Sequence, residues 1–409
     1  MRYATETMAA LVFGLCLAAS RCTAGVLIVD ANGFGDHVTI QAAIDAATDG
    51  DILVVKPVAF CCASAEIHAK SLTLIADVAP GQDTANLTLG IHDVPAGGRV
   101  VVRGFHSGSQ SVNDGQLTVT DCAGSVWIED CRFARIPELL AIGPDAAAEI
   151  QGSPVVTFVR CTFTGADGSN GSVTFPPFPP SPGSAGVLLV HSVAAFHDCT
   201  ATAGGGGFNS FFLGEAGAHG VELQASSAFL SGCAITGGDT GGPVPGGGTA
   251  PGGDGLHLDA ASFAQQLDST IAGGSGGEDI DAPPGAVQPF PGTARSLLVP
   301  APKRGGQGGL LNLSGVQGDV VGFFWNIKAG LLPLPAKKGW FLLDPSLLAG
   351  PFPLAVISSP GGTLDALFVT PALPSALEGQ TLLLQPFFAN TDGITLGAGT
   401  AFVLLKPGL

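Results

Sequence analysis

Residues 186–207 read GVLLVHSVAAFHDCTATAGGGG, and the same pattern returns twice further along the chain. Residues 220–242 read GVELQASSAFLSGCAITGGDTGG, and residues 255–277 read GLHLDAASFAQQLDSTIAGGSGG, so the copies begin 34 and 35 residues apart. Each copy has two short apolar segments, a cysteine or small residue, and a glycine-rich turn. One such unit cannot bury its apolar face alone, so the copies are expected to stack on one another.

Cysteines mark one position of this repeat. Partial copies end in VWIEDCRF (126–133) and VTFVRCTF (156–163), which makes Cys131, Cys161, Cys199 and Cys233 equivalent, with Ser269 in the next copy. Parallel stacking separates equivalent residues by about 4.8 Å, so an internal cysteine ladder is expected. Redox or metal chemistry is one interpretation, and packing of reduced thiols in the core is the other, which Ser269 favours. In the packing interpretation, Cys199→Ser folds and loses about 1–2 kcal/mol by burying a hydroxyl.

The N-terminal part of the repeat region begins differently. The segments 26–30 (VLIVD) and 52–55 (ILVV) are predicted strands. Between them, Ile40, Ala43, Ile44 and Ala47 follow the spacing of one helix face, and Thr39 is a suitable N-cap.

Residues 37–55, HVTIQAAIDAATDGDILVV, resemble the N-terminal cap of right-handed parallel β-helix proteins of the pectate-lyase-like type. This resemblance implies an all-β solenoid over residues 25–290, with a short helix covering its open end. It also implies two activities known on this scaffold, those of polysaccharide lyases and of glycoside hydrolases.

The composition changes after the repeats. Residues 281–294, DAPPGAVQPFPGTA, are predicted to be a Pro-rich linker, and eight short apolar segments follow between Ser296 and Leu405. Their near-regular spacing predicts a small β-sandwich over residues 291–409. The segment resembles β-sandwich domains appended to secreted bacterial repeat proteins.

The first residues have the pattern of an export signal. Arg2 precedes an apolar stretch from Met8 to Ser20, and small residues stand before Gly25. The stretch is too short to span a membrane, and no later segment has transmembrane character. We therefore expect a signal peptide over residues 1–24 and a mature protein that is secreted or held at the cell surface.

Charge excludes one class of partner. The formal net charge is −17, and no Lys or Arg occurs between Arg160 and Arg295. Nucleic-acid binding needs clustered basic residues, so no nucleic-acid partner is expected. Residues 25–290 carry 7 basic and 27 acidic residues, whereas residues 291–409 carry 7 and 5. The many glycines follow no three-residue period along the chain, which excludes collagen.

Aligning the repeats gives one candidate catalytic group. Strand alternation after each glycine directs Glu222, His257 and Asp259 outward, and stacking sets Glu222 beside His257 and Gln224 beside Asp259. A carboxylate next to an imidazole can carry out acid–base catalysis or hold a metal. The alternative is an ordinary solvated polar face.

A second candidate group is a cation site. Residues 273–281, GGSGGEDID, are similar to the GGxGxD calcium-binding repeat, so Glu278, Asp279 and Asp281 are possible calcium ligands. The alternative is that glycine-rich turns between repeats need no metal. No other cofactor is predicted.

No recognisable lyase motif surrounds the arginines of the repeat region, and the paired-acid motifs of glycoside hydrolases are not present as a set. The sequence therefore favours an exported, non-catalytic protein in contact with polysaccharide or a cell-surface component. The alternative is a polysaccharide lyase or glycoside hydrolase on the same scaffold.

Overall fold

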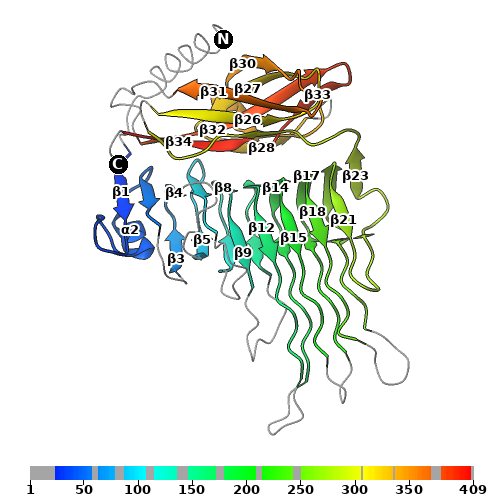
Figure 1. The fold of residues 1–409 in the computed structure, drawn as a ribbon. Helices are drawn as coiled ribbons and strands as arrows, with labels where there is room; N and C mark the ends of the chain where they lie inside the picture. The colour runs from blue at the N-terminus through cyan, green and yellow to red at the C-terminus, as the bar shows by residue number, and fades with distance from the viewer. Residues whose placement is uncertain are drawn as a thin grey trace.

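The computed structural model describes residues 24–57, 63–78, 87–106, 115–135, 146–171, 179–208, 214–242, 250–304, 307–334, 337–369 and 379–406. Within these ranges the protein is all-β, with long parallel sheets and one α-helix (Figure 1). The predicted signal peptide lies outside the described residues except for Ala24, and Cys61 and Cys62 also lie outside them. Among the residues described, no helix is both long enough and apolar enough to cross a membrane.

Three parallel sheets form the first part of the chain. The ten-stranded sheet contains β1 (Val26–Val29), β2 (Ile52–Val55), β4 (Leu72–Ala76), β6 (Arg99–Arg103), β8 (Ser125–Glu129), β11 (Val156–Val159), β14 (Val193–His197), β17 (Ser227–Ser231), β20 (Phe263–Leu267) and β23 (Val287–Phe290). The eight-stranded sheet contains β3 (Ala63–His68), β5 (Leu87–His92), β7 (Leu117–Thr120), β10 (Ala148–Gln151), β13 (Val187–Val190), β16 (Val221–Gln224), β19 (Leu256–Leu258) and β22 (Ile280–Asp281). The five-stranded sheet contains β9 (Arg132–Ala134), β12 (Thr162–Thr164), β15 (Thr200–Thr202), β18 (Ala234–Thr236) and β21 (Thr270–Ala272).

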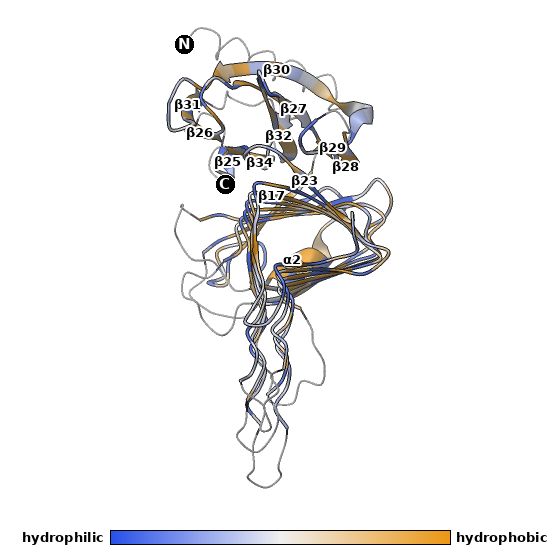
Figure 2. Ribbon diagram, turned by 90° about the vertical axis from the view of Figure 1, so that its right-hand side faces the viewer, coloured by the Kyte–Doolittle hydropathy of each residue, from blue (hydrophilic) through white to orange (hydrophobic). Residues whose placement is uncertain are grey.

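From β8 to β21, each turn of the chain contributes one strand to each of the three sheets, and equivalent residues are register partners. Val187 pairs with Val221, and Val221 pairs with Leu256. The residues that the repeats direct inward are buried, as predicted: Val187, Leu189, Val221, Leu223, Leu256 and Leu258. The apolar core therefore runs through the stack, and Figure 2, which looks along it, shows the turns superposed.

The α-helix α2 (Ile40–Ala46) lies at the N-terminal end of the stack, beside β1 (Figure 1). Thr39 caps it, because its hydroxyl accepts a hydrogen bond from the Ala42 amide at 3.2 Å. Ile40 and Ile44 are buried in the core of the stack, as the apolar spacing predicts. The helix therefore covers apolar side chains that would otherwise face water.

The cysteine ladder lies at the corner that follows the ten-stranded sheet. Before each ladder position, from Cys131 to Ser269, the chain takes a positive φ: 53° at Asp130, 52° at Arg160, 53° at Asp198, 65° at Gly232 and 52° at Asp268. Aspartate tolerates this left-handed conformation better than most residues, which accounts for its repeated use. The ladder cysteines Cys131, Cys161, Cys199 and Cys233 are all buried and free, as the packing interpretation requires.

The ladder also carries hydrogen bonds that packing alone does not require. The Cys161 amide donates to the Cys199 Sγ atom at 3.4 Å, and the Cys233 amide donates to the Ser269 hydroxyl at 3.1 Å. At the corner after the eight-stranded sheet, the Ser153 amide donates in the same way to Ser192 at 3.1 Å. A thiol and a hydroxyl group can therefore play the same part here, because each accepts a hydrogen bond from an amide of the preceding turn.

Below the sheets, the chain runs out and back as a narrow projection, the glycine arm, whose described parts are 165–171, 179–186, 203–208, 214–220, 237–242, 250–255 and 272–279 (Figures 1 and 2). An added Cβ on Gly204, Gly238 or Gly274 would lie 1.8, 1.9 or 2.0 Å from a neighbouring carbonyl oxygen.

The close contacts recur three residues later in the arm. An added Cβ on Gly207 or Gly241 would lie 2.0 or 2.1 Å from a carbonyl oxygen. A three-residue period with glycine at the crowded position is typical of packed polyproline II segments. Within the arm, crowded glycines thus recur in pairs three residues apart, although the glycines of the sequence follow no continuous three-residue period.

The C-terminal part contains mostly antiparallel strands, and each of the eight predicted apolar segments contains one. A three-stranded sheet contains β24 (Ser296–Leu298), β26 (Gly308–Ser314) and β31 (Thr363–Val369). A six-stranded sheet contains β25 (Lys303–Arg304), β34 (Thr400–Leu405), β32 (Gln380–Asn390), β27 (Val320–Asn326), β30 (Ala349–Val356) and β33 (Gly393–Leu396). The strands β28 (Ala329–Pro333) and β29 (Trp340–Leu343) pair with each other, and a 3-10 turn spans Pro345–Leu347.

The predicted linker at 281–294 is wrong in two places, where the chain forms strands. Its first residue, Asp281, ends β22, and Val287–Phe290 form β23, which pairs with β20. Proline is compatible with β23 because this strand lies at the sheet edge, where one row of backbone groups needs no partner.

The C-terminal part packs on the outer face of the ten-stranded sheet. Trp127 and Phe229 from that face share one buried cluster with Trp340 and Leu383 of the C-terminal strands. Both faces of the sheet are therefore covered, which explains why β2, β4 and β8 are buried at every residue.

A buried carboxylate lies in this interface. The Glu129 side chain is fully buried and accepts the Thr400 hydroxyl and the Ala401 amide, both at 2.6 Å. It also forms ion pairs with Arg103, at 3.1 Å, and with Arg160. A buried charge is tolerated only when it is paired and hydrogen-bonded, so these contacts hold the two parts together in one arrangement.

The ladder chemistry revises the expectation for Cys199. Because a hydroxyl can accept the Cys161 amide as Ser269 accepts the Cys233 amide, Cys199→Ser should lose less than about 1 kcal/mol. Cys199→Ala leaves that buried amide without an acceptor and should cost about 1–3 kcal/mol. Urea unfolding of both variants measures the difference. An alanine variant as stable as the wild type would contradict the role of the ladder as a hydrogen-bond acceptor.

Asp198 predicts a pH dependence of stability. Burial raises the pKa of this carboxyl group to about 6, although Arg160 and the Ser296 hydroxyl act in the opposite direction. An unfolded chain releases this proton near pH 4, so the native state loses stability as the pH rises from about 4 to 6.

Asp198→Asn keeps a residue that accepts positive φ and removes the charge. At pH 7 it should stabilise the protein by about 1–3 kcal/mol, and most of that gain should be lost at pH 4. Thermal unfolding at the two pH values tests this expectation. An equal gain at both values would show that ionisation of Asp198 is not the cause.

Candidate functional site

Two of the three predicted acid–base residues lie on the outer face of the eight-stranded sheet. Glu222 on β16 is the register partner of His257 on β19, as the repeat alignment predicts. The next partner of His257 in the column is Asp281 on β22, one of the predicted calcium ligands. The two predicted groups therefore meet at His257.

Four side chains gather at this place, and we call them the histidine–aspartate cluster: His219, Asp254, His257 and Asp281. The imidazole rings of His219 and His257 stack with centroids 4.4 Å apart. The His257 Nδ1 atom lies 2.8 Å from Asp281 Oδ2 and 3.4 Å from Asp254 Oδ2. The His219 Nδ1 atom lies 3.1 Å from Asp254 Oδ2.

His219 acts as a neutral hydrogen-bond acceptor. Its Nδ1 atom accepts the Asp254 amide at 3.1 Å. Burial lowers the pKa of His219, and the neighbouring His257 lowers it further. The cluster therefore ties three successive turns of the stack together at the base of the glycine arm.

Asp259 is occupied elsewhere. Its carboxylate accepts the Ser262 hydroxyl at 2.6 Å and the Ala225 amide at 2.9 Å. The Ser262 hydroxyl lowers the pKa of this carboxyl group most strongly. Gln224 donates to Glu222 at 2.8 Å. Asp259 thus closes the turn between β19 and β20.

The three predicted calcium ligands have different neighbours. Asp279 accepts the Gly273 amide at 3.0 Å, the Glu278 amide donates to Asp254 at 2.8 Å, and Asp281 lies against His257. Two groups of at least three potential metal ligands occur within the described ranges, and neither contains Glu278 or Asp279. These acids do not converge in the way that calcium requires.

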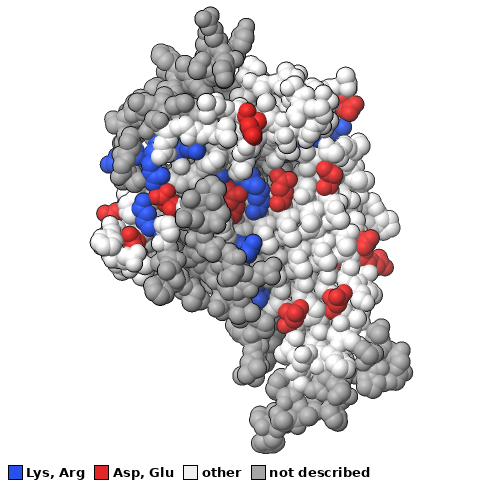
Figure 3. Space-filling model, in the orientation of Figure 1, with Lys and Arg blue, Asp and Glu red and all other residues white. Residues whose placement is uncertain are grey.

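A different site lies between the two parts of the chain. The interdomain cleft, as we call it, has a volume of about 780 Å³. Its charged lining residues are the basic Arg103, Arg132, Arg160, Lys303 and Arg304 and the acidic Asp77 and Asp130. Five of the 16 Lys and Arg residues of an acidic chain therefore line one cleft. Figure 3 shows Lys and Arg gathered, with acids between them, where the C-terminal strands meet the parallel sheets.

Both acids of the cleft are ionised partners of its cations. Burial opposes ionisation of Asp77, but Arg304 at 2.6 Å and Lys56 at 2.7 Å lower its pKa overall. The charges of Arg103 and Arg160 likewise outweigh burial and lower the pKa of Asp130. These ion pairs engage Arg103, Arg160 and Arg304, and the five basic lining residues still outnumber the two acidic ones.

Sequence reasoning missed this cleft. It identified Arg103, Arg132 and Arg160 as arginines of the repeat region without a motif. Lys303 and Arg304 come from β25, more than 140 residues later than Arg160, and reach the cleft because β25 pairs with β34 at the edge of the six-stranded sheet. All arginines of the repeat region lie between positions 99 and 160, and this clustering in the sequence was the signal that could have indicated the cleft.

Mild outcomes are expected for variants at His257 of the histidine–aspartate cluster and at its register partner Glu222. Glu222→Gln and His257→Ala should leave the fold and any polysaccharide retention nearly unchanged, because these partly exposed pairs contribute about 1 kcal/mol or less. Circular dichroism and retention on immobilised polysaccharide measure this. If the wild type shortens a polysaccharide and either variant does not, the cluster is catalytic and this interpretation fails.

No protein-family model matches this sequence, and none of the curated proteins matches it.

Proposed function

We propose that this protein is an exported right-handed parallel β-helix with a small C-terminal β-sandwich, and that it binds an acidic polysaccharide outside the cell or at its surface without cleaving it. The observation that carries the proposal is the cationic lining of the interdomain cleft. Carboxylated sugars present planar anions, which arginine side chains bind in a bidentate manner.

The fold part of the proposal rests on the stacked register. Successive turns donate equivalent strands to three parallel sheets, and a helix covers the N-terminal end, as in the pectate-lyase-like group that residues 37–55 resemble. The chain after β23 forms two sheets that enclose a second apolar core, which supports a sandwich. Export rests on the pattern of residues 1–24.

The overall charge supports a selective site rather than general attraction of anions. The chain carries −17, so an anionic polymer is repelled by most of the surface and attracted where the cleft cations gather. Such an arrangement favours one docking position and makes binding dependent on ionic strength.

The alternative is a polysaccharide lyase that uses the same cleft, which brings basic residues and carboxylates together as such lyases require. Ion pairs engage both described acids, Asp77 with Lys56 and Arg304 and Asp130 with Arg103 and Arg160, which favours binding over metal-assisted cleavage.

Retention on immobilised polygalacturonate at low salt tests the function, with dextran as the neutral polymer. The double variant Arg132→Gln, Lys303→Gln should weaken binding about tenfold, which corresponds to about 1.4 kcal/mol for two lost charge contacts. Raising the salt concentration to about 0.5 M should also weaken binding of the wild type to polygalacturonate.

Lys406→Gln is the matched control, because this exposed lysine lies outside the cleft lining and its loss changes the net charge equally per residue. Equal retention on both polymers, or a double variant retained like the wild type, would refute the cleft as the binding site. A shortened polymer after incubation would support the lyase alternative.

A further inference from the structure

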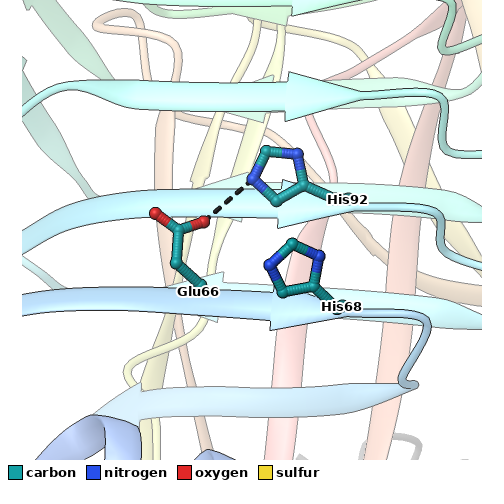
Figure 4. A group of neighbouring side chains, drawn as sticks. All are labelled: Glu66, His68 and His92. Carbon is teal, nitrogen blue, oxygen red and sulfur yellow. Dashed lines mark hydrogen bonds and ion pairs between the residues drawn. The ribbon is translucent and has the colours of Figure 1, made fainter.

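Three potential ligands lie at the other end of the eight-stranded sheet, close to α2. Glu66 and His68 stand two residues apart on β3 and share its outer face, and His92 on β5 is the register partner of His68 (Figure 4). The two imidazole rings stack with centroids 4.7 Å apart. The His92 Nε2 atom lies 2.9 Å from Glu66 Oε2, and one ligand atom from each residue lies within 4.8 Å of the others.

A glycine makes room for this arrangement. Gly90 is the register partner of Glu66, and an added Cβ there would lie 1.7 Å from Glu66 Oε2 and 2.5 Å from His92 Nε2. Its φ is not among the positive values, so backbone conformation does not require glycine. Glycine weakens a strand interior, and here it lets the carboxylate lie across the neighbouring strand against the imidazole.

The backbone of Glu66 is held from the opposite side. β3 is the edge strand of its sheet, and Gln41 of α2 occupies the place of the missing strand. The Gln41 Oε1 atom accepts the Glu66 amide at 2.7 Å, and its Nε2 atom donates to the Glu66 carbonyl at 3.3 Å. The capping helix therefore fixes the strand that carries two of the three ligands.

We propose that Glu66, His68 and His92 bind a zinc-type divalent transition metal. Two imidazole nitrogens and one carboxylate are ligands that zinc prefers, whereas calcium and magnesium take oxygen ligands. The side chains of His92 and Glu66 are 24% and 47% exposed, so the remaining coordination positions face solvent. The site is separate from the interdomain cleft and does not depend on the proposed function.

Calorimetric titration of the whole protein with ZnCl₂ at neutral pH tests the proposal. His92→Ala should weaken binding at least tenfold. Gly90→Ala removes no ligand, yet it should weaken binding to a similar extent, because the new methyl group displaces the Glu66 carboxylate. Cobalt(II) bound to the wild type should give visible absorption bands that both variants lose.

His191→Asn is the matched control, since this exposed histidine belongs to neither group of potential metal ligands and asparagine tolerates its positive φ. Circular dichroism confirms that each variant is folded, and Glu66→Gln replaces Gly90→Ala if that variant does not fold. A wild type that binds no zinc, or a folded His92→Ala variant that binds it equally well, would overturn the site. Undiminished binding by folded Gly90→Ala or Glu66→Gln would overturn the role of the carboxylate.

Discussion

The stacking of equivalent residues in successive turns is the constraint on which the structure depends. Parallel pairing repeats each side chain about 4.8 Å along the stack, so one residue type at one repeat position becomes a ladder. The buried thiol and hydroxyl ladders, the paired histidines and the glycine contacts of the arm all follow from this register. A group that suits one turn must therefore also suit its neighbours.

The ten-stranded sheet that stacking produces must also be covered on its outer face. Its strands are apolar on both faces, so the outer face needs a partner, and the C-terminal strands provide it. Glu129 makes that contact specific, because its carboxylate is buried and needs the Thr400 hydroxyl and the Ala401 amide as donors. This docking determines where the interdomain cleft lies. It therefore brings Lys303 and Arg132 into the lining of the same cleft.

The sequence pattern predicted the features that are periodic or local. The repeats predicted the parallel strands, the inward residues and the pairing of Glu222 with His257, and the local apolar spacing predicted the capping helix with Thr39. The sequence pattern could not predict the docking, since Glu129 and Thr400 belong to no repeated pattern and meet only in three dimensions. It missed β23, because prolines in 281–294 resemble those of a linker. It missed the arm because the three-residue period of its glycines is interrupted in every turn.

Spin-label distances along one column of the eight-stranded sheet test the stacked register most directly. Glu66 and Leu188 are four pairing steps apart, and Glu66 and Glu222 are five. With labels at these positions, the account predicts backbone separations of about 19 Å and 24 Å, which differ by one strand spacing. Two equal distances, or a difference of two or more strand spacings, would contradict the register and with it the ladders and the proposed metal site.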